Sequence, residues 1–212
     1  MHHGRLLVPM KKTSLVPTAR GFTLIEMLVS IALFSIVMVM ALGSLLALSV
    51  ADRRAETLKS AVDNLTFALD SMSRTVRTGQ YYDCGNQANT NPTNCLTGDN
   101  YFTFLAANGV QTYYRFDNAQ DGSSLCGQTT LPYGCIERKL GAGGTWIPIT
   151  APDIVIQNTG YLFHVTGAPQ GSADNYVQPK LTITVTAQVP ITATQTSVIH
   201  MQTNATQRIY DQ

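Results

Sequence analysis

Charged side chains are scarce in this chain, and over one long stretch they are absent. Asp, Glu, Lys and Arg make up 13% of the 212 residues, whereas 44% are hydrophobic. Residues 27 to 51 form a run of 25 without any charge. At about 1.5 Å per helical residue this run covers roughly 37 Å, more than the roughly 30 Å hydrocarbon core of a bilayer. The missing charges therefore predict one membrane-spanning helix.

Acidic residues are missing from the segment that precedes this run. The first 20 residues contain Arg5, Lys11, Lys12 and Arg20 but no Asp or Glu. A basic flank of this kind stays on the cytoplasmic side, so we expect the amino end inside and the rest of the chain across the membrane. The alternative is a secretory signal cleaved near residues 47–49. We disfavour it because such a signal needs only about 7 to 15 apolar residues.

Signatures of catalysis and of metal binding are missing too. The chain has no Gly-x-Ser-x-Gly, no His-Glu-x-x-His and no phosphate-binding glycine loop. Its four cysteines form no Cys-x-x-Cys, which disfavours a zinc or redox site. Residues 117–122 resemble the start of a calcium loop, but Ala119 is at the third position and Gln128 replaces the required Glu. We interpret this segment as a hairpin loop and expect no enzymatic activity, no metal and no cofactor.

Basic residues are few beyond the apolar run. After Thr78 there are five, Arg115, Arg138, Lys139, Lys180 and Arg208, against eight acids. Nucleic-acid-binding domains carry a basic face, so this balance predicts no nucleic-acid partner.

Proline and glycine are absent from residues 52 to 77, which predicts that the helix continues beyond the apolar run. Apolar side chains recur there at steps of three and four and form one stripe: Leu58, Val62, Leu65, Leu69, Met72 and Val76. We expect this stripe to pack on the chain's own sheet; the alternative is a coiled-coil seam with another subunit. Gly79 is expected to end the helix after Thr78 in a left-handed conformation.

Residues 80 to 212 have a different pattern, in which β-branched and aromatic residues alternate with polar ones. Asn108-Gly109, between runs at 101–105 and 110–116, is a strong hairpin signal. Further strands are expected at residues 135–140, 153–157, 161–165, 180–187 and 196–206. Alternation leaves one face of a sheet in water, so the other face is free to pack on the helix. The expected fold class is α+β: a long N-terminal helix, with a membrane half and an amphipathic half, on an antiparallel sheet.

The four cysteines, Cys84, Cys95, Cys126 and Cys135, all follow the apolar run. They would therefore lie in an oxidising compartment, where disulfides are the default. Four cysteines allow three connectivities. We favour the nearest-neighbour pairs, Cys84 with Cys95 and Cys126 with Cys135, because each would close one Gly- and Asn-rich loop.

Glu26 is a lone acid at the front of the apolar run. A carboxylate in hydrocarbon is unfavourable by several kcal/mol unless it is neutralised or paired, which indicates a functional group with a partner. Its surroundings read Gly21-Phe22-Thr23-Leu24-Ile25-Glu26-Met27-Leu28-Val29. This motif resembles the prepilin peptidase site of type IV pilins and type II secretion pseudopilins. The leader of 21 residues is longer than many in that family, and Met10 is an alternative start.

The resemblance implies cleavage between Gly21 and Phe22, with Phe22 becoming the N-methylated first residue. Glu26 then takes the fifth position and pairs with the new amino group of a neighbouring subunit. Each charge makes burial of the other tolerable in a low-dielectric filament core. The implied fold is pilin-like. The implied partners are the prepilin peptidase, other pilin or pseudopilin subunits, the inner-membrane assembly platform and the lipid bilayer.

The expected organisation has four segments along the chain. Residues 1–21 are the cytoplasmic leader and residues 22–51 the transmembrane and filament-core helix. Residues 52–78 are its amphipathic continuation, and residues 79–212 form a β-rich extracytoplasmic domain. The chain is expected in the inner membrane as a single-pass protein with its amino end inside, and afterwards in an extracytoplasmic filament.

The second half of the sequence bears on the role of the subunit. Residues 153–163, the strand near Leu181 and residues 199–208 look like the C-terminal region of minor pilins and J-type pseudopilins. The implied function is a minor pilin or pseudopilin, a non-enzymatic assembly subunit. The alternatives are a signal-anchored extracytoplasmic binding protein or enzyme, which would keep residues 1–21, and a soluble secreted protein that begins near Val50.

Overall fold

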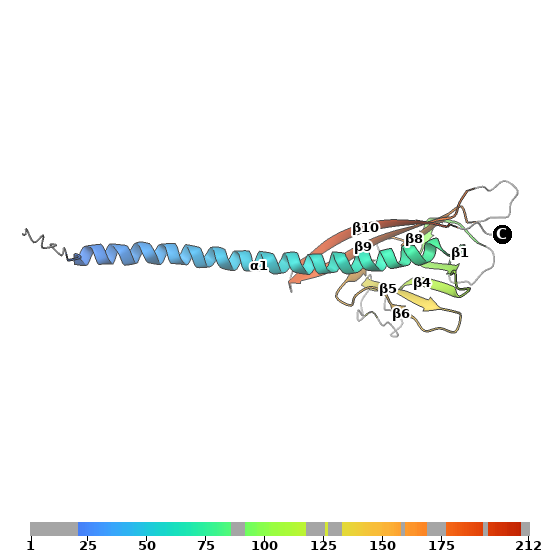
Figure 1. Cartoon of the computed structure of the whole chain (residues 1–212), viewed down its shortest axis with the longest axis horizontal. Helices are drawn as coiled ribbons and strands as arrows, with labels where there is room; N and C mark the ends of the chain where they lie inside the picture. Colours follow the sequence, from blue (N-terminus) through green and yellow to red (C-terminus); the bar gives the residue numbers. More distant parts are fainter. Residues whose placement is uncertain are drawn as a thin grey trace, which may run out of the picture. The chain divides into compact units, whose positions relative to one another are not determined.

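The structure is a computed structural model that describes residues 21–85, 92–117, 126, 133–157, 160–168, 177–192 and 195–208. Residues 1–20 of the expected leader, and residues 118–122 of the expected hairpin loop, lie outside this part. The chain divides into two compact units, one up to Val50 and one from Ala51 onward. Helix α1 (Leu24–Arg77) contributes to both units, and all the strands belong to the second (Figure 1).

The first unit contains the apolar part of α1. Every described residue up to Val50 is exposed, including large side chains such as Leu33, Phe34 and Met40. A helix that is apolar all round is normally buried, either in a protein core or in a membrane. Among the described residues α1 is the one helix long and apolar enough to cross a bilayer.

The second unit begins with the amphipathic part of α1, whose buried face differs from the expected stripe at one end. Leu65, Leu69, Met72 and Val76 are buried as the spacing predicts. Val62, however, is 37% exposed, and that part of the prediction was wrong. Ala61 is buried instead, at 1% exposure, so the packed face includes the residue before Val62 at this end of the stripe.

The end of α1 is tied to the sheet by hydrogen bonds. The hydroxyl of Tyr82 donates to the carbonyl of Val76 at 2.7 Å, and the backbone amide of Arg208 donates to the carbonyl of Arg77 at 3.0 Å. These bonds satisfy carbonyls that a helix end leaves without an intrahelical partner. The C-terminal segment therefore closes back onto the end of the helix.

Gly79 follows the helix as expected, but not in the left-handed conformation that the sequence predicts. The positive φ falls on Tyr81, at 55°, where the register of the first strand shifts. A glycine is needed at 79 for a different reason. A Cβ atom there would collide with the ring of Phe104 and approach the carbonyl oxygen of Leu105 to 2.9 Å.

Ten strands form one antiparallel sheet among the described residues, in the order β1-β3-β4-β5-β7-β9-β8-β2, with β10 paired to β9 and β6 to β5. The strands are β1 (Gln80–Cys84), β2 (Cys95–Asp99), β3 (Tyr101–Leu105), β4 (Gln111–Asp117), β5 (Tyr133–Leu140), β6 (Ile147–Pro148), β7 (Val155–Gln157), β8 (Phe163–Thr166), β9 (Lys180–Thr192) and β10 (Gln195–Thr206). Seven of them were expected, and β1, β2 and β6 were not. The fold class is α+β, one long N-terminal helix followed by an antiparallel sheet domain.

The turn at Asn108-Gly109 joins β3 to β4 as expected. Gly109 has a φ of 76°, and the side-chain oxygen of Asn108 accepts from the amide of Val110 at 3.0 Å. The register then pairs Phe104 with Thr112 and Phe102 with Tyr114.

The core between α1 and the sheet is rich in aromatic rings. Tyr82, Phe102, Phe104 and Phe163 are fully buried, and neighbouring rings lie 5.5 to 6.4 Å apart between centroids. These spacings are within the range of favourable aromatic pairs.

The opposite face of β4 and β5 carries a buried ion pair beneath the single tryptophan. Arg115 Nε lies 2.8 Å from a carboxylate oxygen of Glu137. The guanidinium carbon is 4.3 Å from the ring centroid of Trp146, and Lys139 Nζ is 4.9 Å from the same centroid. Burial acts to lower the pKa of Arg115, but the hydrogen bond and the charge of Glu137 outweigh it, and the pKa is raised. Both faces of this part of the sheet are thus covered.

Candidate processing and assembly site

The residues of the N-terminal motif lie at the start of α1. Gly21, Phe22 and Thr23 precede the helix, and a Cβ atom at Gly21 would meet no other atom within 4 Å. Phe22 is 76% exposed and Leu24 is 78% exposed. The bond between Gly21 and Phe22 therefore lies in an open, non-helical segment immediately before the helix begins.

Thr23 caps the helix. Its side-chain Oγ1 accepts a hydrogen bond from the backbone amide of Glu26 at 3.3 Å, and its carbonyl accepts from the amide of Met27 at 3.2 Å. A Ser or Thr followed three residues later by Glu is the sequence signature of a capping box. The spacing of Thr23 and Glu26 already carries this signal, although the cap was not among the expected features.

Glu26 occupies the first turn of α1, where a negative charge is favourable next to the unpaired amides of a helix N-terminus. Ser30, one turn further on, donates its hydroxyl to the carbonyl of Glu26 at 2.7 Å. In the described part of the chain no lysine or arginine forms an ion pair with the Glu26 carboxylate.

The four cysteines form two disulfides in the second unit. Cys84 at the end of β1 is bonded to Cys95 at the start of β2, and Cys126 is bonded to Cys135 in β5, with Cα separations of 5.9 and 5.5 Å. These are the nearest-neighbour pairs. Cys126 and Cys135 also lie close to Glu137, but their sulfur atoms are bonded to each other and not available as metal ligands.

Asp83 is a buried carboxyl next to the first of these disulfides. It is 1% exposed, its Oδ1 accepts from the hydroxyl of Thr93, and its Oδ2 has no hydrogen-bond partner. Burial raises the pKa of Asp83, and the nearby charge of Asp99 raises it further. The hydrogen bonds from Thr93 and from the backbone of Cys84 lower the pKa, but by less than burial raises it.

The chain thus has an exposed apolar helix, capped at its start and with a single acid in the first turn, followed by a disulfide-bonded sheet. These features define a class of α+β proteins with a membrane anchor at the amino end. Residues 17–42 match the family model of the prokaryotic N-terminal methylation motif. This match is consistent with the type IV pilin and pseudopilin family and supports a pilin-like or pseudopilin subunit. No curated protein and no solved structure matches the chain significantly.

The motif has two consequences for partners. It implies processing by a prepilin peptidase and assembly with other pilin subunits, and proteins that carry it are structural rather than enzymatic. Together with the apolar helix it indicates anchoring in a membrane.

Proposed function

We propose that this chain is a minor pilin or pseudopilin, a subunit assembled into a type IV pilus or a type II secretion pseudopilus. The observation that carries the proposal is the placement of Glu26. It is the one acid in the exposed apolar part of α1 up to Val50, in the first turn, four residues after Phe22. The pattern of residues 153–163 and 199–208 favours a minor or J-type subunit over a major one.

The proposed pairing follows from the charges that processing creates. Cleavage after Gly21 leaves a cationic amine on Phe22, about one helical turn before Glu26. No described lysine or arginine pairs with the Glu26 carboxylate, so its cation has to come from another molecule. In a bundle of such helices the amine of a neighbouring subunit is that cation, and pairing offsets the cost of burying each charge in apolar surroundings.

The proposed location follows from the flanking charges. Arg5, Lys11, Lys12 and Arg20 hold the amino end in the cytoplasm, and the sheet domain lies outside. The two disulfides suit an oxidising compartment. The inner-membrane assembly platform then moves the processed subunit from the bilayer into the filament.

The test is the mass of the chain extracted from the membrane fraction of its host. We expect an amino terminus at Phe22 that carries one methyl group on the new amine. The variant Gly21→Leu is expected to keep the leader, which appears as a slower band on a gel.

Other outcomes would replace the proposal. A chain that keeps its initiator methionine would indicate a signal-anchored extracytoplasmic binding protein or enzyme. A chain that begins near Val50 would indicate a soluble secreted protein.

A further inference from the structure

Phe67 is a large apolar side chain on the solvent side of α1. It is 77% exposed, although its neighbours Leu65 and Leu69 are 0% and 3% exposed. Two residues correspond to about 200° around a helix, so Phe67 points away from the packed face. An aromatic side chain in this position has no role in the core of its own domain.

Asp63 lies one turn before Phe67 on the same side of the helix, because residues four apart are neighbours on a helix surface. It is exposed and makes no ion pair with any described residue. The next acid, Asp70, is already bonded to Arg74 at 2.8 Å. The exposed side of α1 therefore presents a phenyl ring with one free carboxylate beside it.

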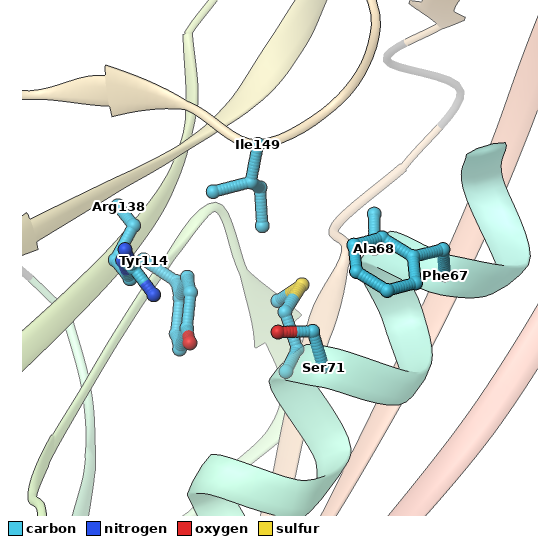
Figure 2. Close-up of a pocket in the computed structure, with 7 residues that line it drawn as sticks. Phe67, Ala68, Ser71, Tyr114, Arg138 and Ile149 are labelled. Carbon is cyan, nitrogen blue, oxygen red and sulfur yellow. The ribbon is translucent and has the colours of Figure 1, made fainter.

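A pocket of about 200 Å³ lies on the flank of the same helix, within the second unit (Figure 2). Phe67, at its edge, lines it from α1 together with Ala68, Ser71 and Met72, and Tyr114, Arg138 and Ile149 line it from the sheet and the segment after β6. Figure 2 shows Tyr114 and Arg138 facing the helix residues across the space, with Phe67 beyond Ala68 at the edge.

The size and lining of this pocket suit a phenyl ring. A cavity of about 150 Å³ with apolar walls is large enough to bind benzene. Arg138 supplies a positive charge at one wall, and no described carboxylate forms an ion pair with it. The pocket thus complements a surface that presents an aromatic ring and an acid.

We propose that Phe67 of one copy of this chain inserts into the pocket of a second copy, with Asp63 of the first copy facing Arg138 of the second. The chain carries both halves of this contact, and their charges are opposite. Aromatic residues and arginine are also the residue types that dominate binding energy at interfaces.

Because Phe67 also lies at the edge of the pocket, the ring and the pocket are on the same flank of α1, and each copy presents both to a neighbour. The inference rests on the proposed function, since it requires copies anchored side by side in one membrane or filament. It names the surface by which the folded domains meet, which is separate from the pairing of Glu26.

The test is cysteine cross-linking between two differently tagged full-length copies expressed in the same host. One copy carries Phe67→Cys and the other Ile149→Cys. We expect a disulfide-linked heterodimer in the membrane fraction, severalfold more abundant than with the control copy Val198→Cys. Val198 is 47% exposed on β10, away from the pocket lining. The mass of the processed chain is measured in the same samples.

The proposed contact between Asp63 and Arg138 is tested by reversing each charge in the two copies used for cross-linking. Asp63→Lys on the Phe67→Cys copy, or Arg138→Glu on the Ile149→Cys copy, is expected to lower the cross-linked fraction about two- to fivefold. The two changes together are expected to restore it, which neither variant would do if it had merely misfolded.

Three results overturn the inference. They are a heterodimer no more abundant than with the Val198→Cys control, a cross-link from position 67 to a different protein, or no restoration by the double exchange. If the chain in these samples still begins at Phe22, the proposed function stands without this interface. If the leader is retained, it is the proposed function that fails.

Discussion

At the scale of single residues, two carboxylates show how strongly surroundings decide the role of the same group. Glu26 lies at an open helix start, where Thr23 caps the backbone and no described cation pairs with the acid. Asp83 is enclosed by the sheet and has one oxygen without a partner. The first is available to another molecule, and the second acts only on the stability of its own domain.

Replacing Glu26 tests its pairing with another subunit. We expect Glu26→Ala to leave membrane insertion intact and to abolish incorporation into filaments, measured as the sheared fraction relative to the membrane fraction. Glu26→Gln should be equally impaired in incorporation, because Gln carries no charge. Gln also suits the third position of a capping box, so the helix start should be kept. The matched control is Glu56→Ala, an exposed acid of the same helix beyond the apolar run. Normal incorporation of Glu26→Gln would contradict the charge argument.

Asp83 makes the folded protein more stable as the pH falls from neutral. Its pKa is raised in the folded protein, so the folded state binds more protons than the unfolded state above the ordinary value of 3.8. Stability therefore rises as pH falls from neutral toward that value. In Asp83→Asn this contribution is absent, so the wild-type protein should gain thermal stability relative to the variant on acidification. Parallel midpoints at all pH values would contradict it.

At the scale of elements, some boundaries follow from local pattern and others do not. Strand β3 and its hairpin partner were predictable, because the alternation and Asn108-Gly109 act within one short stretch. Strand β2 was not. Its sequence contains a glycine, Gly98, and it forms because β8 pairs with it and a disulfide holds its first residue. Pairing between segments that are far apart in the chain produces no local periodicity in the sequence, so it cannot be predicted from one short stretch.

The helix itself shows the same limit. The buried stripe of α1 was predictable from its spacing, but Val62 was misplaced because spacing alone does not set where the sheet ends. Phe67 and Arg138 were not recognised from the sequence as residues of a pocket, since that pocket exists only after α1 and β5 come together. A large aromatic residue off the stripe was the one sequence signal available.

A pair of substitutions on α1 separates packing from assembly. Leu69→Ala removes a fully packed side chain and is expected to lower the free energy of unfolding by about 2–5 kcal/mol. Phe67→Ala, two residues away, should change it by no more than about 0.5 kcal/mol, since the ring is exposed. Chemical denaturation in detergent measures both. A large loss for Phe67→Ala would place that ring in the core of its own domain.

At the scale of the whole molecule, the two units differ in what covers their apolar surface. The buried hydrophobic residues begin at Ala61, and none precedes it among the described residues. The exposed large side chains are concentrated before residue 51. The second unit thus contains its own core, whereas the first depends on lipid or on other helices.

This division predicts the behaviour of a shortened chain. A protein that starts at Ala51 should be soluble without detergent and form both disulfides. Its thermal midpoint should lie within a few degrees of that of the full chain in detergent, because no core residue is lost. Gel filtration, calorimetry and mass measurement under non-reducing conditions check this. Aggregation of the shortened chain would mean that the first unit contributes to the core.

The sequence by itself determined the parts of this protein that act through neighbouring residues. These are the uncharged span, the Gly21–Phe22 motif with its acid at Glu26, the helical stripe and the tight hairpin. Only the tertiary structure decided which strands pair, that Gly79 is required by the ring of Phe104, that Asp83 is enclosed and that a pocket opens beside Phe67. Local features follow from periodicity and composition, whereas burial and close approach depend on segments far apart in the chain.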